Sequence, residues 1–278
     1  MKTHLLLFAS LGLGMLCVSC SEAPKGPQPG TPAFYWAAAK EMFHAGNYPK
    51  ANDDLMEITR SDNEFTARAR AMQLVLAAGM TEGYRELAEI YDTGAKANRQ
   101  NPMPFRKEAS TLRSLAATTA MELAETVHAS TAKDNDAAVL LAFEFPTGSA
   151  SEPQGLKKIG GGMLLQDSEK ELLQLAMLQR GVVRALCRIV GNADDIAKTV
   201  EVFKAPEVKV QRDAWRFESA KLVFDQGELF DAKRLDQPNR LKVMCDEAAS
   251  VLKTVPPSKE TKALDTKIQA ALKKIKAT

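Results

Sequence analysis

The residues of this chain best suited to covalent chemistry are its four cysteines, which fall into two pairs along the sequence. Cys17 and Cys20 have the C-x-x-C spacing of redox motifs, but they end an N-terminal segment with the features of an export signal, so no redox centre is predicted there. Cys187 and Cys245 lie in the C-terminal half. In an oxidising compartment they could form one disulfide. The alternative is two separate buried thiols, which pack as small hydrophobic side chains.

Other patterns that could support catalysis or metal binding are incomplete. His44 and His128 have neither a histidine four residues away nor a cysteine pair, so metal ligation is not predicted. Ser130–Lys133 fits S-x-x-K and Ser61–Asn63 fits S-D-N, but their order is the reverse of that in penicillin-binding proteins, and K-T-G is absent. A phosphate-binding loop follows a strand, but no strand is predicted before Gly160–Gly162. We therefore expect no catalytic residue, no metal and no cofactor, and we interpret the protein as a non-enzyme.

The first twenty residues have the pattern of an export signal. Lys2 supplies a positive charge and Leu5–Val18 is almost wholly apolar. This apolar run is shorter than the roughly 20 residues that a transmembrane helix needs. We therefore exclude the segment from the predicted fold.

The end of this segment, Val18-Ser19-Cys20, resembles a bacterial lipoprotein signal, which is cut before a cysteine that receives lipid. The resemblance implies a signal peptide at 1–19, acyl chains such as palmitate on Cys20, and a membrane anchor. Cys17 departs from the family pattern, which has an aliphatic residue at this position. Ser21 in place of Asp implies the outer membrane, with the protein facing the periplasm. The alternatives are an ordinary secretory signal cut elsewhere and an uncleaved anchor.

Composition indicates a globular protein with a sizeable core. Of 278 residues, 45% are hydrophobic and 26% are charged, and the net charge of +2 gives no indication of nucleic-acid binding. Residues 20–30 are rich in Pro and Gly and are predicted to be a flexible tether. Lys259–Lys276 is predicted to be a basic amphipathic helix, which either contacts anionic lipid or packs on its neighbours.

Apolar residues recur at helical spacing along most of the chain, so the predicted fold class is all-α. Val139–Phe143 could be a buried helix or a strand, and its context favours a helix. Pro and Gly residues predict a loop at 146–166. This loop divides an N-terminal helical region, 31–145, from a C-terminal one, 167–278.

The N-terminal region resembles tetratricopeptide repeats. Two helical hairpins, Pro32–Arg60 and Glu64–Ala97, recur at close to the 34-residue spacing of that family, with Gly79 expected to separate the helices of the second. Ala45–Ala51 resembles the inter-helix turn, and Tyr35 occupies the aromatic position of the first helix. Departures are Ile58 in place of Ala and the lack of a closing Pro. The resemblance implies stacked antiparallel hairpins, an α-solenoid, followed by a second helical region.

A solenoid of this kind has a concave groove that binds peptides or partner helices. We therefore predict an envelope-tethered scaffold for protein–protein interaction, similar to lipoproteins of envelope assembly, whose partners are envelope proteins or peptides. Four tyrosines are candidates either for partner binding or for packing: Tyr35, Tyr48, Tyr84 and Tyr91. The alternative function is a ligand-binding or enzymatic lipoprotein whose site lies between the two helical regions.

Overall fold

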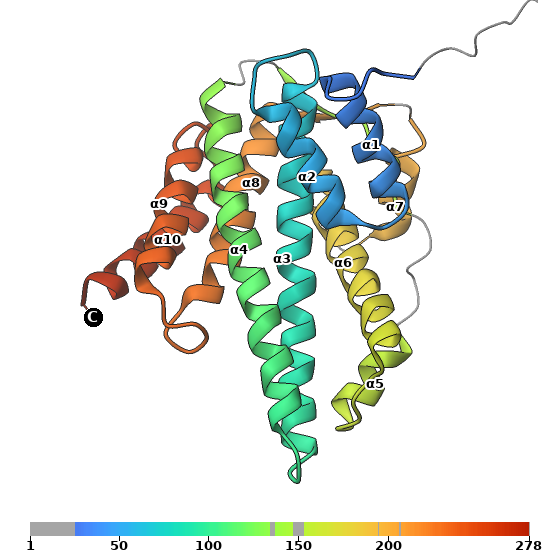
Figure 1. The fold of residues 1–278 in the computed structure, drawn as a ribbon. Helices are drawn as coiled ribbons and strands as arrows, with labels where there is room; N and C mark the ends of the chain where they lie inside the picture. The colour runs from blue at the N-terminus through green and yellow to red at the C-terminus, as the bar shows by residue number, and fades with distance from the viewer. Residues whose placement is uncertain (1–25, 134–136, 147–152, 194, 206, 278) are drawn as a thin grey trace, which may run out of the picture.

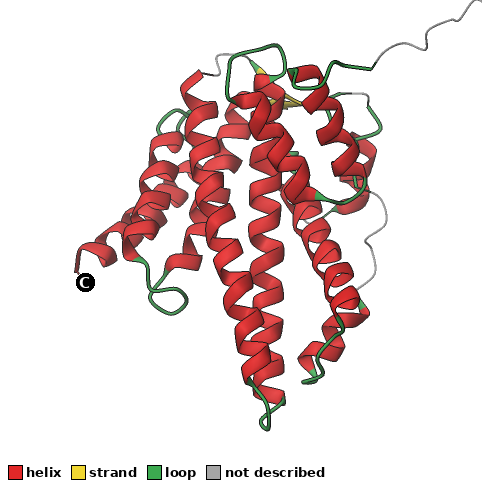
Figure 2. Ribbon diagram, viewed as in Figure 1, coloured by secondary structure: helices red, strands yellow, loops and turns green. Residues whose placement is uncertain are grey.

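The computed structural model describes residues 26–133, 137–146, 153–193, 195–205 and 207–277. The predicted signal peptide and Cys20 lie outside these residues. Within them the chain is mostly helical, which confirms the all-α class, with one short sheet (Figures 1 and 2). The helices are α1 (Pro32–His44), α2 (Tyr48–Thr59), α3 (Thr66–Ala97), α4 (Met103–Lys133), α5 (Gln154–Gly160), α6 (Asp167–Ile189), α7 (Ile196–Val202), α8 (Arg212–Gly227), α9 (Pro238–Leu252) and α10 (Lys259–Ala277), with a 3-10 turn at Glu228–Phe230.

The first hairpin begins and turns where the sequence predicts. Thr31 caps α1 by accepting a hydrogen bond from the backbone N–H of Phe34 at 3.2 Å, and Pro32 occupies the first turn. Gly46 adopts a φ of +75°, a conformation that residues with a Cβ rarely adopt, and it reverses the chain. Asn47 then caps α2 through the N–H of Lys50.

The predicted second hairpin is wrong, because Thr66–Ala97 is one continuous helix of 32 residues. α3 lies at the centre of the molecule, between α4 and α6, with α2 and α8 packed against it (Figure 1). Gly79 does not end a helix. It lies in the middle of α3, where the backbone of α6 comes so close that a side chain would not fit.

The prediction of a helix at Val139–Phe143 is also wrong. Ala138–Leu141 forms strand β1, which pairs antiparallel with β2 (Val208–Gln211), so that Val139 lies opposite Val210. Residues alternate between buried and less buried positions along both strands. The partner strand lies about seventy residues later in the sequence, so local pattern alone did not reveal it.

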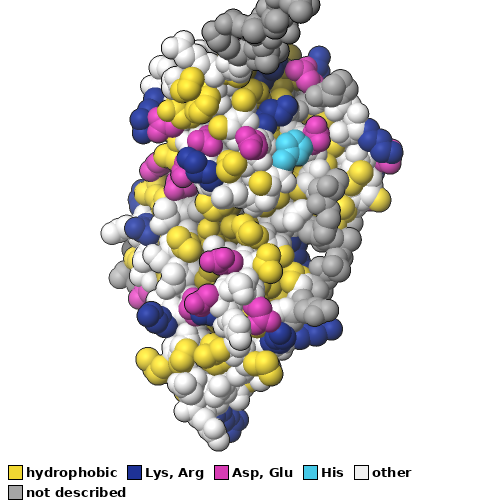
Figure 3. All heavy atoms as spheres, turned by 45° about the vertical axis from the view of Figure 1, so that its right-hand side comes forward, with side chains coloured by type: hydrophobic (Ala, Val, Ile, Leu, Met, Phe, Trp, Pro, Cys, Tyr) yellow, Lys and Arg dark blue, Asp and Glu magenta, His cyan; other side chains and the backbone are white. Residues whose placement is uncertain are grey.

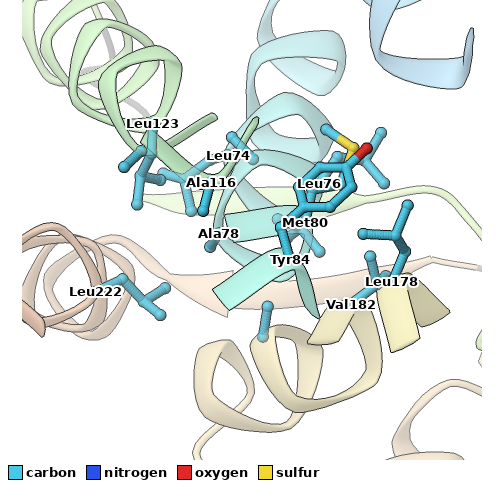
Figure 4. Close-up of a cluster of buried hydrophobic side chains, with 14 of the residues drawn as sticks. Leu74, Leu76, Ala78, Met80, Tyr84, Ala116, Leu123, Leu178, Val182 and Leu222 are labelled. Carbon is cyan, nitrogen blue, oxygen red and sulfur yellow. The ribbon is translucent and has the colours of Figure 1, made fainter. Parts of the chain in front are cut away.

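The two predicted helical regions share one hydrophobic core. Figure 4 shows Leu74 and Tyr84 of α3 gathered with Leu178 and Val182 of α6 and with Leu222 of α8, and these side chains belong to one cluster of buried residues. The predicted loop at 146–166 contains α5, which buries Leu156 and Ile159 against this core and thereby corrects the loop prediction. The loop therefore does not separate two independent cores.

The C-terminal helix α10 packs on its neighbouring helices, which is one of the two alternatives that the sequence leaves open. Leu264 and Ile268 are buried, and the helix contacts α9 and α8. Lys262 and Lys267 are exposed on its other side. Among the described residues, the model contains no helix that combines the length and apolar character needed to cross a membrane.

Candidate functional site

A groove of about 760 Å³ lies between the helices, and we call it the central groove. Its residues come from both predicted helical regions. The α1–α2 hairpin contributes Met42, Ala45 and Asn47, α3 contributes Leu87 and Tyr91, α4 contributes Glu108 and Leu112, and α6 contributes Asp167, Lys170, Glu171, Gln174 and Leu175. The groove thus depends on α6 packing against α3.

The walls of the central groove are mainly apolar. Leu87, Leu112 and Tyr91 are buried at its base, whereas Leu175 is 38% exposed at its edge. Figure 3 turns α1, α5, α6 and α7 toward the viewer and shows hydrophobic side chains gathered at mid-height on this face, with acidic side chains among and below them. An apolar patch with a polar border is typical of a site that binds another molecule.

Charged side chains border the groove at one end. Lys170 Nζ lies 3.4 Å from Glu108 Oε1 and 3.3 Å from Asp167 Oδ1. Burial works against the charge of Lys170, but the two carboxylates outweigh it and raise the lysine's pKa. Glu171 has no ion-pair partner within the described part of the chain. With three carboxylates and one ammonium group, this end of the groove is negatively charged.

The four predicted tyrosines do not form a common binding surface. Tyr48, Tyr84 and Tyr91 are buried, and desolvation raises the pKa of each phenol. Tyr48 and Tyr84 therefore have the packing role that was considered as the alternative to partner binding. Tyr91 is packed as well, but it also lines the central groove. Tyr35 is partly buried and packs its ring against Phe34, with 5.6 Å between centroids.

Cys187 and Cys245 are separate thiols in the structure. Cys187 lies in α6 and Cys245 in α9, and both are free and buried. Burial raises the pKa of the Cys245 thiol to about 11. Burial also raises the pKa of Cys187, although a hydrogen bond with Thr199 opposes this shift. Neither thiol is activated as a nucleophile, which would need a lowered pKa.

The catalytic fragments of the sequence have structural roles where they are described. Ser130 donates a hydrogen bond to the carbonyl of Val127 inside α4, and Asn63 accepts one from the N–H of Phe65 in the turn before α3. His128 contacts Glu247 at 3.1 Å. No group of three or more metal-ligating side chains occurs within the described residues.

Sequence reasoning missed the part of the groove that α6 contributes. Leu172 and Leu175 belong to the apolar pattern of this helix in the sequence, but Leu172 is 69% exposed and Leu175 lines the groove. The available signal was the width of the stripe, because Leu172, Leu173 and Leu175 together are more than one buried face can hold.

Comparisons with protein families, curated proteins and solved structures find no match to this chain. Its function is therefore argued from the groove and from the sequence.

Proposed function

We propose that this protein is a non-enzymatic interaction scaffold of the bacterial cell envelope, anchored by lipid on Cys20, which binds an amphipathic segment of a partner in the central groove. The observation that carries the proposal is the groove itself, whose apolar wall is open to solvent and is bordered by an excess of carboxylates. An amphipathic helix placed in an apolar groove is a recurring mode of peptide recognition.

The groove favours a partner segment with apolar residues on one side and Lys or Arg at one end. Leu175 of α6 and Met42 of α1 both line the groove and offer apolar contact. Glu171 has no cation beside it among the described residues and is available to pair with a basic side chain. Such a pair contributes to orientation and association rate more than to affinity.

The tetratricopeptide-like hairpin supports the same proposal. Its turn, Ala45–Asn47, forms one border of the groove, and in the family that it resembles such hairpins present grooves to peptides. The helices that follow this hairpin do not form a regular solenoid, because α3 is one long helix. In this proposal the protein faces the periplasm from the outer membrane, and its partners are envelope proteins or peptides.

The groove is tested by recovering the partner from detergent-solubilised envelope after mild crosslinking, followed by mass spectrometry. We expect Leu175→Glu to lose the partner that the unaltered protein recovers. Val243→Glu is the matched control, since Val243 is 47% exposed on α9, away from the groove. Glu171→Lys should weaken recovery through charge reversal, with Glu201→Lys as its control. Recovery of no protein, or equal recovery by all variants, contradicts the proposal.

The anchor is tested separately by Cys20→Ser. We expect this variant to move from the membrane fraction to the soluble fraction, because the acyl chains would be lost. Unchanged membrane fractionation would show that lipid on Cys20 is not the anchor. This result would not affect the groove.

A ligand-binding or enzymatic lipoprotein is the second candidate. It is favoured by the position of the groove between the two predicted helical regions, and by Tyr91 and Lys170, which line it and have raised pKa values. A small molecule that raises the melting temperature of the unaltered protein but not that of Leu175→Glu would favour this candidate over the scaffold.

A further inference from the structure

A second cavity of about 320 Å³ shares no lining residue with the central groove. We call it the α2–α4 cleft. One wall is α2, through Asn52, Met56, Thr59 and Arg60, and the other is α4, through Glu122, Glu125, Thr126 and Ala129. Arg70 and Gln73 of α3 complete the lining.

One end of the cleft holds a carboxylate without a counter-ion. Glu122 Oε2 accepts a hydrogen bond from Asn52 Nδ2 at 3.4 Å, and Asn52 is only 6% exposed. Desolvation raises the pKa of Glu122, and the charged groups that act on it, Glu125 and Asp53, are acidic as well. Among the described residues no basic side chain forms an ion pair with Glu122. This end is therefore suited to a cation.

The other end of the cleft is basic. The side chain of Arg70 is 14% exposed, and its ion-pair contact with the exposed Asp62 is long, at 3.8 Å. Arg60 adds a second guanidinium group, which Glu57 contacts at 2.8 Å. A guanidinium group in a cleft is suited to bind a carboxylate through two parallel hydrogen bonds.

Gln73 lies between these two ends and presents its amide to the cleft. It is 7% exposed and lines the cleft one helical turn from Arg70. Its side chain forms no hydrogen bond with any other described residue. Its amide atoms are not among the fully buried polar atoms that lack a partner, so they face the space of the cleft, where a ligand can hydrogen-bond to them.

The register of α3 and α4 places the two charges at opposite ends. Thr81 of α3 and Thr119 of α4 are joined through their hydroxyl groups at 2.8 Å. Because the helices are antiparallel, Arg70, eleven residues before Thr81, lies level with residue 130 of α4. Glu122 is about eight residues away from that level, or roughly 12 Å at the helical rise of 1.5 Å per residue.

We propose that the α2–α4 cleft binds a free, extended peptide of about three residues. At roughly 3.3–3.6 Å per residue, three residues span the distance between the charged ends. The peptide's α-ammonium group pairs with Glu122 and Asn52, its α-carboxylate pairs with Arg70 and Arg60, and one of its amides pairs with Gln73. Small side chains fit best, since the cleft has a volume of only about 320 Å³.

The test is calorimetric titration of the full mature chain with trialanine near pH 7. N-acetyl-trialanine lacks the ammonium group and trialaninamide lacks the carboxylate. We expect each blocked peptide to bind at least tenfold more weakly than trialanine, and dialanine and hexaalanine to bind more weakly too. Glu122→Gln and Arg70→Gln should each weaken trialanine binding at least tenfold. Glu201→Gln and Arg99→Gln, exposed and outside the cleft, are the matched controls.

Three results would overturn this proposal: no heat of binding with trialanine at about 10 mM, equal affinity for the blocked peptides, or tighter binding of spermidine that Arg70→Gln leaves unchanged. The last result would define a simple cation site. The blocked peptides test the unaltered protein, so the experiment decides the matter even if a variant fails to fold. Because the cleft and the central groove share no residue, failure here would leave the scaffold proposal standing.

Discussion

Gly79 of α3 and Gly181 of α6 meet where the two helices cross, so closely that a β-carbon on Gly181 would overlap the carbonyl oxygen of Gly79. A β-carbon on Gly79 would lie 2.5 Å from the Cα of Val182. Gly83, one turn further along α3, is restricted in the same way by the carbonyl oxygen of Met177, at 2.7 Å. The position of α6, and with it one wall of the central groove, depends on these three glycines.

We expect Gly181→Ala to destabilise the protein by about 1–3 kcal/mol or more, because the added methyl group meets backbone atoms that cannot move without separating the helices. Chemical denaturation followed by circular dichroism measures this loss. Gly160→Ala in α5 is the control. The β-carbon added at this position meets no neighbouring atom within 4 Å. The stability of the Gly160→Ala variant should therefore be unchanged or slightly higher. Equal effects of the two substitutions would show that the crossing is not tight.

The buried hydroxyl pair Thr81–Thr119 is expected to couple α3 to α4. Thr81→Val should cost about 1 kcal/mol, since it removes the 2.8 Å hydrogen bond and leaves the Thr119 hydroxyl with only its contacts to its own helix. The double variant with Thr119→Val should be less destabilised than the sum of the two single variants. A double-mutant cycle by denaturation measures this coupling, and strict additivity would contradict it.

Stability is expected to depend on pH through Glu122, whose pKa burial raises above its ordinary value of 4.5. A carboxyl with a raised folded pKa holds its proton more tightly in the folded state. Stability is therefore lost as pH rises from the ordinary pKa through the folded one. Glu122→Gln removes this loss, so the variant should gain stability relative to the unaltered protein between pH 4 and pH 7 in denaturation experiments.

Glu169 provides the control of opposite sign. Its pKa is lowered by a hydrogen bond from Lys158 and another from the backbone of Gln166, so it stabilises the folded protein above its ordinary pKa and less as pH falls. Glu169→Gln should therefore lose stability relative to the unaltered protein between pH 4 and pH 7. If both variants moved in the same direction, the assigned causes would be wrong.

The two buried thiols, Cys187 and Cys245, are expected to remain reduced in the purified protein. Iodoacetamide should label neither Cys187 nor Cys245 under native conditions, because both are buried and their raised pKa values keep them protonated. After unfolding in denaturant without a reductant, both should be labelled. Mass spectrometry gives the number of labelled cysteines. If neither Cys187 nor Cys245 is labelled after unfolding, the two form a disulfide instead.

Local sequence signals predicted the elements that are specified locally. The start of the first hairpin at Pro32, its turn within Ala45–Ala51 and the amphipathic C-terminal helix all lie where the sequence places them. Gly79 was misinterpreted, because the usual rule that a glycine stops a helix does not account for a neighbouring helix that needs the space. Strand β1 was missed because its hydrogen-bonding partner, Val208–Gln211, is distant in sequence.

The candidate sites were less predictable than the fold. Glu122 and Arg70 resemble ordinary charged residues on helix surfaces, and only the packing of α2 over α3 and α4 brings them into one cleft. The central groove likewise combines Met42 with Leu175, which are separated by more than a hundred residues. A helical period identifies which residues share a face, but it does not identify which face another helix will leave uncovered.

The pairing of β1 with β2 also bears on the order in which the chain folds. α3 and α4 are joined by a short turn and can pair early, whereas β1 must wait for a strand that lies beyond residues 142–207. During that interval Val139 and Leu141 belong to an unpaired apolar strand. An exposed strand edge can pair with another copy of itself. A chain interrupted before Val208 therefore risks aggregation through β1, in addition to losing the core residues of α8, α9 and α10.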